Sequence, residues 1–184
     1  MTEERDHRPV ERTNSDDIEN GSRRVKIIFL DIDGVLVNHR SWDLQQSFDH
    51  LPADERCVQA LNRIVALTGA LIVVTSSWRI DRDLAELREI INQRFGVTGQ
   101  VIDKTPRITR EVFPGKIHKL LIAAKRGDEI AAWLAKCEYN TNIQSFVILD
   151  DDSDMGELLN RTVLTDFKEG LTEADADRAL EMLQ

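Results

Sequence analysis

The feature that most constrains this chain is an apolar run, residues 25–30, that ends at two carboxylates spaced by one residue. These are Asp31 and Asp33, and Gly34 follows directly after them. The run is short, rich in β-branched residues and apolar on both faces, which is typical of an interior strand of a parallel sheet. In such sheets the chemistry takes place just beyond the carboxyl ends of the strands. Asp31 and Asp33 are therefore candidate site residues by position alone.

Two later apolar runs also end in polar side chains. Residues 71–75 are followed by Ser76, and residues 145–149 are followed by the acidic group 150–154. Because the runs alternate with helical patterns, the sequence predicts an α/β domain, a Rossmann-like three-layer sandwich with a mostly parallel central sheet. If the strands are neighbours, their polar ends converge on one crevice.

Capping residues and breakers predict where the other elements begin and end. Apolar residues recur at helical spacing between Pro52 and Gly69, and residues 117–122 are expected to form a helical turn or two. Further helices are expected after Asp81, from Gly127 and after Thr172, and short strands near 100–102 and 163–164.

The length of 184 residues suits one domain with a full core and is too short for two comfortable ones. Residues 1–24 are polar and lack an apolar period, so we expect a disordered tail followed by one domain over residues 25–184.

A net charge of −9 disfavours bulk attraction to nucleic acid or anionic membrane. The sequence shows no apolar segment of signal-peptide type and no run that could span a bilayer, so we expect a cytoplasmic protein.

One segment, residues 104–126, reverses the local sign of charge. It holds seven lysines and arginines and His118 against a single acid, Glu111. Two interpretations have equal weight. The segment either offsets an otherwise acidic domain, or it forms a positive rim that positions the phosphates of an anionic polymer or nucleotide.

The polar strand ends carry groups that suit phosphoryl chemistry. Two carboxylates at close range cannot both stay ionised without a cation, because like charges raise each other's pKa. A hard divalent ion resolves this conflict, and Mg²⁺ typically takes a few carboxylate or carbonyl oxygens, several waters and a substrate phosphate. A hydroxyl and a basic side chain then complete a cradle for the charge that develops on a transferring phosphoryl group.

Four sequence elements, which follow the strands and precede the helix described above, resemble the motifs of the haloacid dehalogenase superfamily of phosphohydrolases. The resemblance covers essentially everything from Val25 to the C-terminus. One Asp-x-Asp pair is a weak signal, but four elements in the right order on the right kind of secondary structure make a specific match. The matching elements are Asp31-Ile32-Asp33-Gly34-Val35, Ser76 after the second long strand, Lys125 or Arg126 before a helix, and Asp150-Asp151 with Asp154.

The resemblance implies roles for the acidic residues. Asp31 would be the nucleophile that forms an aspartyl-phosphate. Asp33 would be the general acid for the leaving oxygen and then the base that activates water. Mg²⁺ would be held by the Asp31 carboxylate, the backbone carbonyl of Asp33 and the last motif. There we favour Asp151 as the direct ligand, with Asp150 and Asp154 around it or exchanging roles with it.

The same resemblance implies which residues bind the phosphate. Ser76 would hydrogen-bond the phosphate, with Thr75 as its replacement if the strand ends one residue earlier. The third motif of the family is normally one lysine, and here Lys125 and Arg126 stand on equal terms. For Arg79, a phosphate contact and a salt bridge are equally weighted.

The extension Trp78-Arg79 resembles a subgroup of compact family members associated with RNA repair and, more loosely, the 3′-phosphatase half of polynucleotide kinases. Little room for an inserted domain remains after Gly34 or between Arg79 and Lys125, so we expect a minimal cap domain or none, and an open site. The resemblance therefore implies a Mg²⁺-dependent phosphatase that acts on an RNA or DNA terminus or on a nucleotide.

Three other functions stay open. A small-metabolite phosphatase would share the motifs, and so would a binding module that keeps the fold and the metal without turnover. A receiver domain also uses a phosphorylated aspartate with Mg²⁺, but its acceptor lies on a middle strand and not on the first, which disagrees with this order. The sequence leaves the oligomeric state open.

Overall fold

Five parallel strands form the central sheet of the computed structural model, which describes residues 24–43, 52–112, 120–136 and 142–184. The strands lie in the order β3-β2-β1-β6-β7, and each pairs in parallel with its neighbours. This arrangement confirms the predicted mostly parallel α/β sheet. The bounds are β1 Val25–Leu30, β2 Leu71–Val74, β3 Val101–Lys104, β6 Ile143–Asp150 and β7 Thr162–Leu164.

Some predicted features lie outside the described residues. Of the tail predicted over residues 1–24, only Arg24 is described. The middle of the basic segment, residues 113–119, is outside as well. Among the helices that the structure describes, none is long and apolar enough to cross a membrane.

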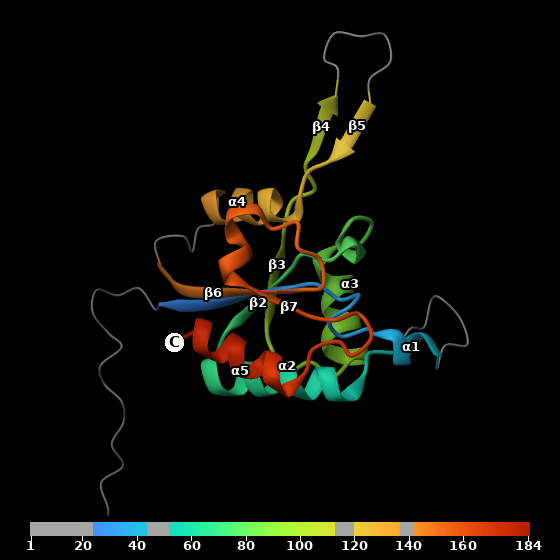
Figure 1. Ribbon diagram of the computed structural model, residues 1–184, viewed down its shortest axis with the longest axis vertical. Helices are drawn as coiled ribbons and strands as arrows, with labels where there is room; N and C mark the ends of the chain where they lie inside the picture. Colours follow the sequence, from blue (N-terminus) through green and yellow to red (C-terminus); the bar gives the residue numbers. More distant parts are fainter. Residues whose placement is uncertain (1–23, 44–51, 113–119, 137–141) are drawn as a thin grey trace, which may run out of the picture.

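Helices cover both faces of the sheet, which is the middle of three layers (Figure 1). α4, Arg126–Lys136, lies on one face with the short turn Gly156–Arg161. The short helix α1, His39–Asp43, lies near the edge where the strands end. The helices on the other face are α2 Glu55–Thr68, α3 Leu84–Arg88 with its continuation Glu89–Arg94, and α5 Glu173–Met182.

Alternate side chains of β1 point to opposite faces of the sheet. Ile28 and Leu30 belong to the core beside α2, α3 and α5, whereas Ile27 and Phe29 belong to the core beneath α4. All four side chains are fully buried. The Phe29 ring meets the Trp133 ring of α4 edge to face, with the centroids 5.3 Å apart. Burial on both faces explains the apolar run and fixes the position of its carboxyl end.

Two helices have the boundaries that the sequence predicted. α2 closes at Gly69, which has a φ of +65°, and α5 is capped by the Thr172 side chain. The prediction that Asp81 caps the next helix is wrong. α3 is capped by Asp83, whose side chain accepts from the backbone N–H of Glu86 at 2.9 Å while the Glu86 carboxylate accepts from the Asp83 N–H at 2.7 Å. This reciprocal pair satisfies two N–H groups at the helix start.

A two-stranded hairpin lies between β3 and α4 and projects from the body of the domain (Figure 1). Its strands, β4 Thr109–Val112 and β5 Leu120–Ala123, pair antiparallel, with Thr109 opposite Ala123. The helical turn predicted within residues 117–122 is therefore wrong for the described part of that run. The pattern of a short apolar run fits a helix and a strand equally well. Here the run forms a strand because it pairs with β4.

The start of α4 lies directly against the loop that follows β6. A Cβ on Gly127 would lie 2.2 Å from the backbone oxygen of Met155. The backbone N–H of Arg126 donates to the Asp154 carboxylate at 3.0 Å. Only a residue without a Cβ allows this close approach of helix and loop.

We expect Gly127→Ala to lower the free energy of unfolding by about 1–3 kcal/mol, the usual cost of overpacking. The added Cβ would meet a backbone atom, which cannot rotate away. Urea unfolding followed by circular dichroism measures the change. Ala131→Gly, at an exposed position of the same helix, measures helix propensity alone, about 0.5–1 kcal/mol. A gain in stability of that size from Gly127→Ala would contradict the prediction.

Candidate active site

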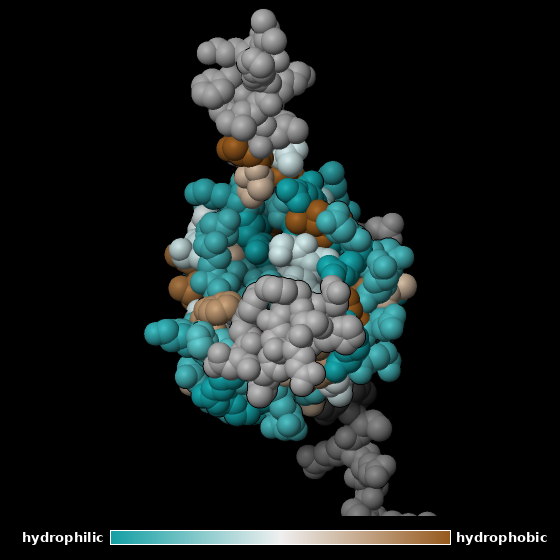
Figure 2. Space-filling model, turned by 90° about the vertical axis from the view of Figure 1, so that its right-hand side faces the viewer, coloured by the Kyte–Doolittle hydropathy of each residue, from teal (hydrophilic) through white to brown (hydrophobic). Residues whose placement is uncertain are grey.

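The carboxyl ends of β1, β2 and β6 meet at one edge of the sheet, on the right in Figure 1 and toward the viewer in Figure 2. The last residue of β1 pairs with Val74 on one side and Leu149 on the other. The residues that follow these positions, Asp31, Thr75 and Asp150, therefore lie side by side. Most of the coloured surface on this face is hydrophilic (Figure 2).

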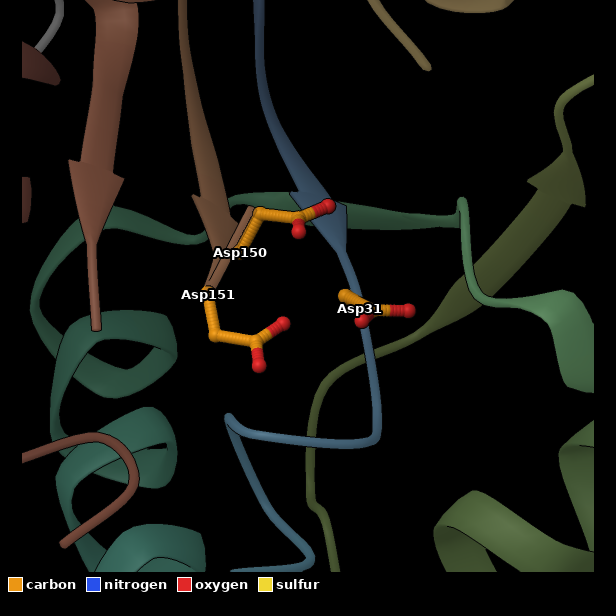
Figure 3. Close-up of side chains that lie close together, drawn as sticks. All are labelled: Asp31, Asp150 and Asp151. Atoms are coloured by element: carbon orange, nitrogen blue, oxygen red, sulfur yellow. The ribbon is translucent and has the colours of Figure 1, made fainter. Parts of the chain in front are cut away.

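Three carboxylates cluster at this edge (Figure 3). Asp31, Asp150 and Asp151 each offer an oxygen, and these oxygens lie within 4.8 Å of one another. Asp31 and Asp150 are buried. Burial, reinforced by the negative charge of Asp31, raises the pKa of both Asp150 and Asp151 above the usual range. The ionised cluster is therefore unfavourable unless a cation lies close by.

The oxygen atoms at this edge fit a hard divalent cation. Asp150 Oδ2 and Asp154 Oδ1 are buried and have no hydrogen-bond partner among the described residues, although Arg126 Nη1 lies 3.3 Å from Asp150 Oδ2. Mg²⁺ prefers carboxylate and carbonyl oxygens, so the clustered side chains of Asp31, Asp150 and Asp151 could hold it. Asp33 does not belong to this cluster, so the metal contact predicted for Asp33 rests on its backbone carbonyl.

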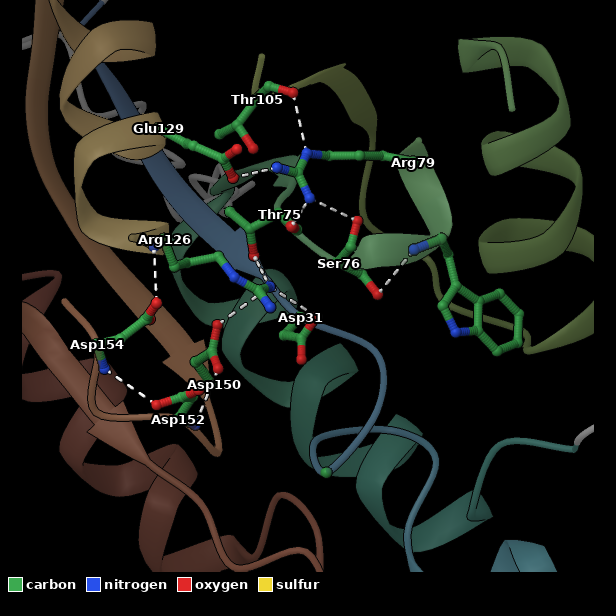
Figure 4. A network of polar contacts seen from close by, with 12 residues as sticks. Asp31, Thr75, Ser76, Arg79, Thr105, Arg126, Glu129, Asp150, Asp152 and Asp154 are labelled. Atoms are coloured by element: carbon green, nitrogen blue, oxygen red, sulfur yellow. Dashed lines mark hydrogen bonds and ion pairs between the residues drawn. The ribbon is translucent and has the colours of Figure 1, made fainter. Parts of the chain in front are cut away.

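Asp154 ties the acidic loop to the start of α4 (Figure 4). Its Oδ2 accepts from the backbone N–H of Arg126 at 3.0 Å, and its own N–H donates to Asp152 Oδ1 at 3.1 Å. The N–H of Asp152 in turn donates to Asp150 Oδ1 at 3.0 Å. These bonds fold the loop after β6 back on itself and keep its acids at the sheet edge.

Gly34 allows the loop after β1 to lie against Asp151. The φ of Gly34 is +72°, in the left-handed region that disfavours residues with a Cβ. A Cβ at this position would lie 2.3 Å from both Cγ and Oδ2 of Asp151. The backbone oxygen of Gly34 accepts from Thr165 Oγ1 at 2.8 Å, which holds the loop in place.

Arg126 is the cation of the site (Figure 4). Its Nη1 donates to Asp31 Oδ1 at 2.9 Å and lies 3.3 Å from Asp150 Oδ2. Burial opposes the charged form, but the carboxylates of Asp31 and Asp150 outweigh it and raise the pKa of Arg126. Lys125, the alternative for the third motif, has an exposed side chain. The structure thus places Arg126 at the site, one residue later than Lys125.

The two hydroxyls after β2 have different partners. Thr75 Oγ1 accepts from Arg126 Nη1 at 3.4 Å and so faces the site. Ser76 Oγ accepts from the backbone N–H of Trp78 at 3.4 Å and caps the 3₁₀ turn Ser77–Arg79. Both residues are fully buried. The alternative in which Thr75 supplies the hydroxyl group is the one that this geometry favours.

Arg79 does not face the site, and the phosphate contact predicted for it is not what the structure shows. Its guanidinium is buried and forms an ion pair with Glu129. It also donates to the backbone oxygens of Thr75, Ser76 and Thr105 (Figure 4). Of the two interpretations of Arg79, a salt bridge and a phosphate contact, the structure contains the salt bridge. The N–H donors of its guanidinium already form hydrogen bonds with these acceptors.

Glu129 was not identified from the sequence. It lies in α4 directly before Ile130, which is fully buried, and is itself 5% exposed. A glutamate on the apolar face of a helix indicates a buried cationic partner, since an unpaired buried charge is strongly unfavourable. The position of Glu129 among apolar residues is therefore the sequence signal that could have predicted a salt bridge for Arg79.

Asp33 is bound to the turn after β2. Trp78 Nε1 donates to Asp33 Oδ2 at 2.9 Å. Burial raises the pKa of Asp33, the Trp78 hydrogen bond opposes this, and the charges of Asp31 and Asp151 add to the increase.

One edge of the sheet therefore combines a buried carboxylate beside an arginine, a second carboxyl group with a raised pKa, a hydroxyl, and oxygens for a divalent cation. Such a set can transfer a phosphoryl group.

We expect Gly34→Ala to weaken Mg²⁺ binding about tenfold or more, since displacing groups around metal ligands costs 10–100-fold. The new Cβ would displace the Asp151 carboxylate. Calorimetric titration with Mg²⁺ measures the affinity. Gly69→Ala is the matched control, because Gly69 has a φ of +65° and no atom within 4 Å of its added Cβ. Equal Mg²⁺ affinities of the two variants would contradict the prediction.

Comparison with known protein families matches residues 27–176 to the HAD domain in Swiss Army Knife RNA repair proteins. This match spans well over half of the 184 residues and includes the residues of the sheet edge described above. No curated protein matches the chain. HAD domains suggest a phosphohydrolase and typically use a divalent metal, which agrees with the acidic cluster. The chain therefore belongs to the HAD domains of Swiss Army Knife RNA repair proteins.

Proposed function

We propose that this HAD domain is a Mg²⁺-dependent phosphomonoesterase that forms an aspartyl-phosphate on Asp31. The observation that carries the proposal is the position of Arg126 Nη1, 2.9 Å from Asp31 Oδ1 and 3.3 Å from Asp150 Oδ2. A phosphate placed against Asp31 meets a partly buried guanidinium and carboxylates that could hold a second cation. Fixed positive charge of this kind stabilises the oxygens of a transferring phosphoryl group.

In the first step an oxygen of Asp31 attacks phosphorus, and the bond between phosphorus and the leaving oxygen breaks. Asp33 donates a proton to that leaving oxygen. Burial is the main cause of the raised pKa of Asp33, so this carboxyl group keeps its proton closer to neutral pH than a free aspartic acid does. The Asp31 carboxylate, which accepts from Arg126 Nη1 at 2.9 Å, is the attacking group.

In the second step water attacks the phosphorus of the aspartyl-phosphate. Asp33, now a carboxylate, accepts a proton from the water, and the bond between phosphorus and the Asp31 oxygen breaks. Arg126 and the Thr75 hydroxyl hold the phosphate oxygens during both steps. Inorganic phosphate leaves, and Asp31 returns to its starting form.

The divalent cation would be held by Asp31, Asp150 and Asp151, together with the backbone carbonyl of Asp33. When bound, it supplies charge that neutralises the phosphate oxygens. Arg126 orients the phosphate against Asp31, and Gly34 allows Asp151 to reach the site that the cation would occupy.

We expect Asp31→Asn to lower kcat by about 10³-fold or more, because the amide cannot act as the nucleophile. Phosphate release from p-nitrophenyl phosphate with Mg²⁺ present measures activity, and EDTA should abolish the wild-type rate. Asp152→Asn is the control: Asp152 is an exposed acid of the same loop, and asparagine keeps its oxygen acceptor. Full activity of Asp31→Asn would refute the mechanism.

The substrate we propose is a phosphate at the end of an RNA or DNA strand. The matched family is named for RNA repair proteins. The described part of the segment between β3 and α4 contains a β-hairpin and no helix or domain of its own, which agrees with a site that the end of a large substrate could reach. A cationic groove beside α4 gives further support.

This groove, of about 350 Å³, lies between the end of β3 and α4. Four basic residues and one acid, Asp103, line it. Arg79 is paired with Glu129, and the other three basic residues are Lys104, Arg107 and Lys136, of which the last two are exposed. Lys136 follows Arg126 by ten residues, which is about 15 Å along a helix axis. That separation exceeds the size of one phosphate group. The groove therefore suits a polyanion whose terminal phosphate lies at Asp31.

We expect the double substitution Arg107→Ala and Lys136→Ala to raise KM for a 3′-phosphorylated oligonucleotide about tenfold, through lost phosphate contacts. KM for p-nitrophenyl phosphate should not change. Arg161→Ala with Lys168→Ala removes two exposed cations outside the groove and is the charge-matched control. Steady-state kinetics at fixed salt measure both substrates.

The same assay separates the substrate classes. Faster turnover of sugar phosphates than of oligonucleotides with 3′- or 5′-terminal phosphates would replace the nucleic acid substrate with a small metabolite. An unchanged oligonucleotide KM in the double variant would show that the groove does not bind the nucleic acid.

A further inference from the structure

Trp78 connects the ends of two strands. It lies in the turn after β2, whereas its hydrogen-bond partner Asp33 lies in the loop after β1, 45 residues away. The indole nitrogen donates to Asp33 Oδ2 at 2.9 Å. An indole N–H is a donor and never an acceptor. Asp33 Oδ2 is therefore the acceptor, and in a protonated carboxyl group the carbonyl oxygen is a better acceptor than the hydroxyl oxygen.

The indole ring is itself held in place. The backbone N–H of Trp78 donates to Ser76 Oγ at 3.4 Å. The ring meets Phe95 edge to face with the centroids 6.0 Å apart, and the Arg82 guanidinium lies 5.5 Å from the ring centroid. Arg82 Nη1 also donates to the backbone oxygen of Trp78 at 3.2 Å. A donor fixed in this way can impose an orientation on its acceptor.

We propose that Trp78 is the residue that positions Asp33 for proton transfer, by making Oδ2 the carbonyl oxygen and leaving Oδ1 to carry the proton. A protonated carboxyl group has one hydroxyl oxygen and one carbonyl oxygen. Since Oδ2 accepts the indole N–H, the form with the proton on Oδ1 is favoured. This inference rests on the phosphomonoesterase mechanism proposed above.

The proton path is then defined at each step. In the first step the Oδ1–H bond of Asp33 breaks, its proton joins the leaving oxygen, and the electron pair of the broken P–O bond stays on that oxygen. Asp33 is left as a carboxylate that is still bound to Trp78 through Oδ2. In the second step Oδ1 takes a proton from the attacking water, which restores the starting form.

The test compares two substrates with the same ring and different leaving groups, phenyl phosphate and p-nitrophenyl phosphate. Phenolate is the more basic leaving group and needs the proton from Asp33, whereas p-nitrophenolate leaves with little help. For Trp78→Phe, which removes the N–H and keeps a ring, we expect kcat/KM to fall about tenfold with phenyl phosphate and less than twofold with p-nitrophenyl phosphate. The ratio kcat/KM reports the first step, so slow hydrolysis of the aspartyl-phosphate does not mask the effect.

Matched variants isolate the N–H group. Trp78→His keeps a ring donor and should keep the substrate ratio within about twofold of the wild type, since the donated hydrogen bond is retained. Phe95→Leu removes the ring contact and leaves the N–H in place, so the ratio should not change. Asp33→Asn should shift the ratio in the same direction as Trp78→Phe and further. Trp78→Leu, which also lacks the donor, provides a second variant if Trp78→Phe does not fold.

Each outcome decides one question. An equal fall with both substrates, or a change confined to KM, would overturn the positioning role, because a residue that merely shapes the site or touches the substrate gives that result. If Asp31→Asn stays active, the proposed function itself fails. If Asp31→Asn is inactive and Asp33→Asn shifts the ratio but Trp78→Phe does not, this inference alone fails.

Discussion

A buried ion pair between Arg79 and Glu129 holds together the segments that surround the site. Arg79 donates to backbone oxygens after β2 and β3, including those of Thr75 and Thr105. Glu129 also accepts from the N–H of Ile108 at the base of the hairpin, at 2.9 Å. Removing one partner of such a pair costs about 3–5 kcal/mol of folding stability, because the other buried charge is left without a partner. The intact pair itself adds little net stability. Its effect is to fix where these segments lie relative to α4.

The two arginines show what a sequence can predict about a site and what it cannot. Both were identified as candidates because basic residues near strand and helix ends suit phosphate binding. Which of them lies at the acidic cluster depends on partners distant in sequence: Arg126 pairs with Asp31, and Arg79 pairs with Glu129. The choice between Lys125 and Arg126 depends in the same way on a shift of one residue at the start of α4. Local patterns do not contain this information.

The sheet was more predictable than the segments around it. A strand buried on both faces must be apolar along its length, so β1, β2 and β6 were visible in the sequence, and parallel pairing brings their carboxyl ends together. The hairpin was not visible, because Leu120–Ala123 forms a strand through its pairing with Thr109–Val112. The start of α3 was misplaced by two residues, since Asp81 and Asp83 are both acceptable caps and the reciprocal bond with Glu86 selects one.

The site shares its backbone hydrogen bonds with the sheet. The N–H of Asp31 donates to the backbone oxygen of Leu149 at 3.0 Å, and the N–H of Thr75 donates to that of Leu30 at 2.8 Å. Amide protons in the middle of a sheet exchange with solvent only when the sheet opens, whereas a hairpin paired with itself alone is marginally stable. Deuterium should therefore enter last beside Asp31 and Thr75 and early in the hairpin. The acidic cluster therefore cannot move apart unless the central sheet opens, whereas β4 and β5 can separate without opening that sheet.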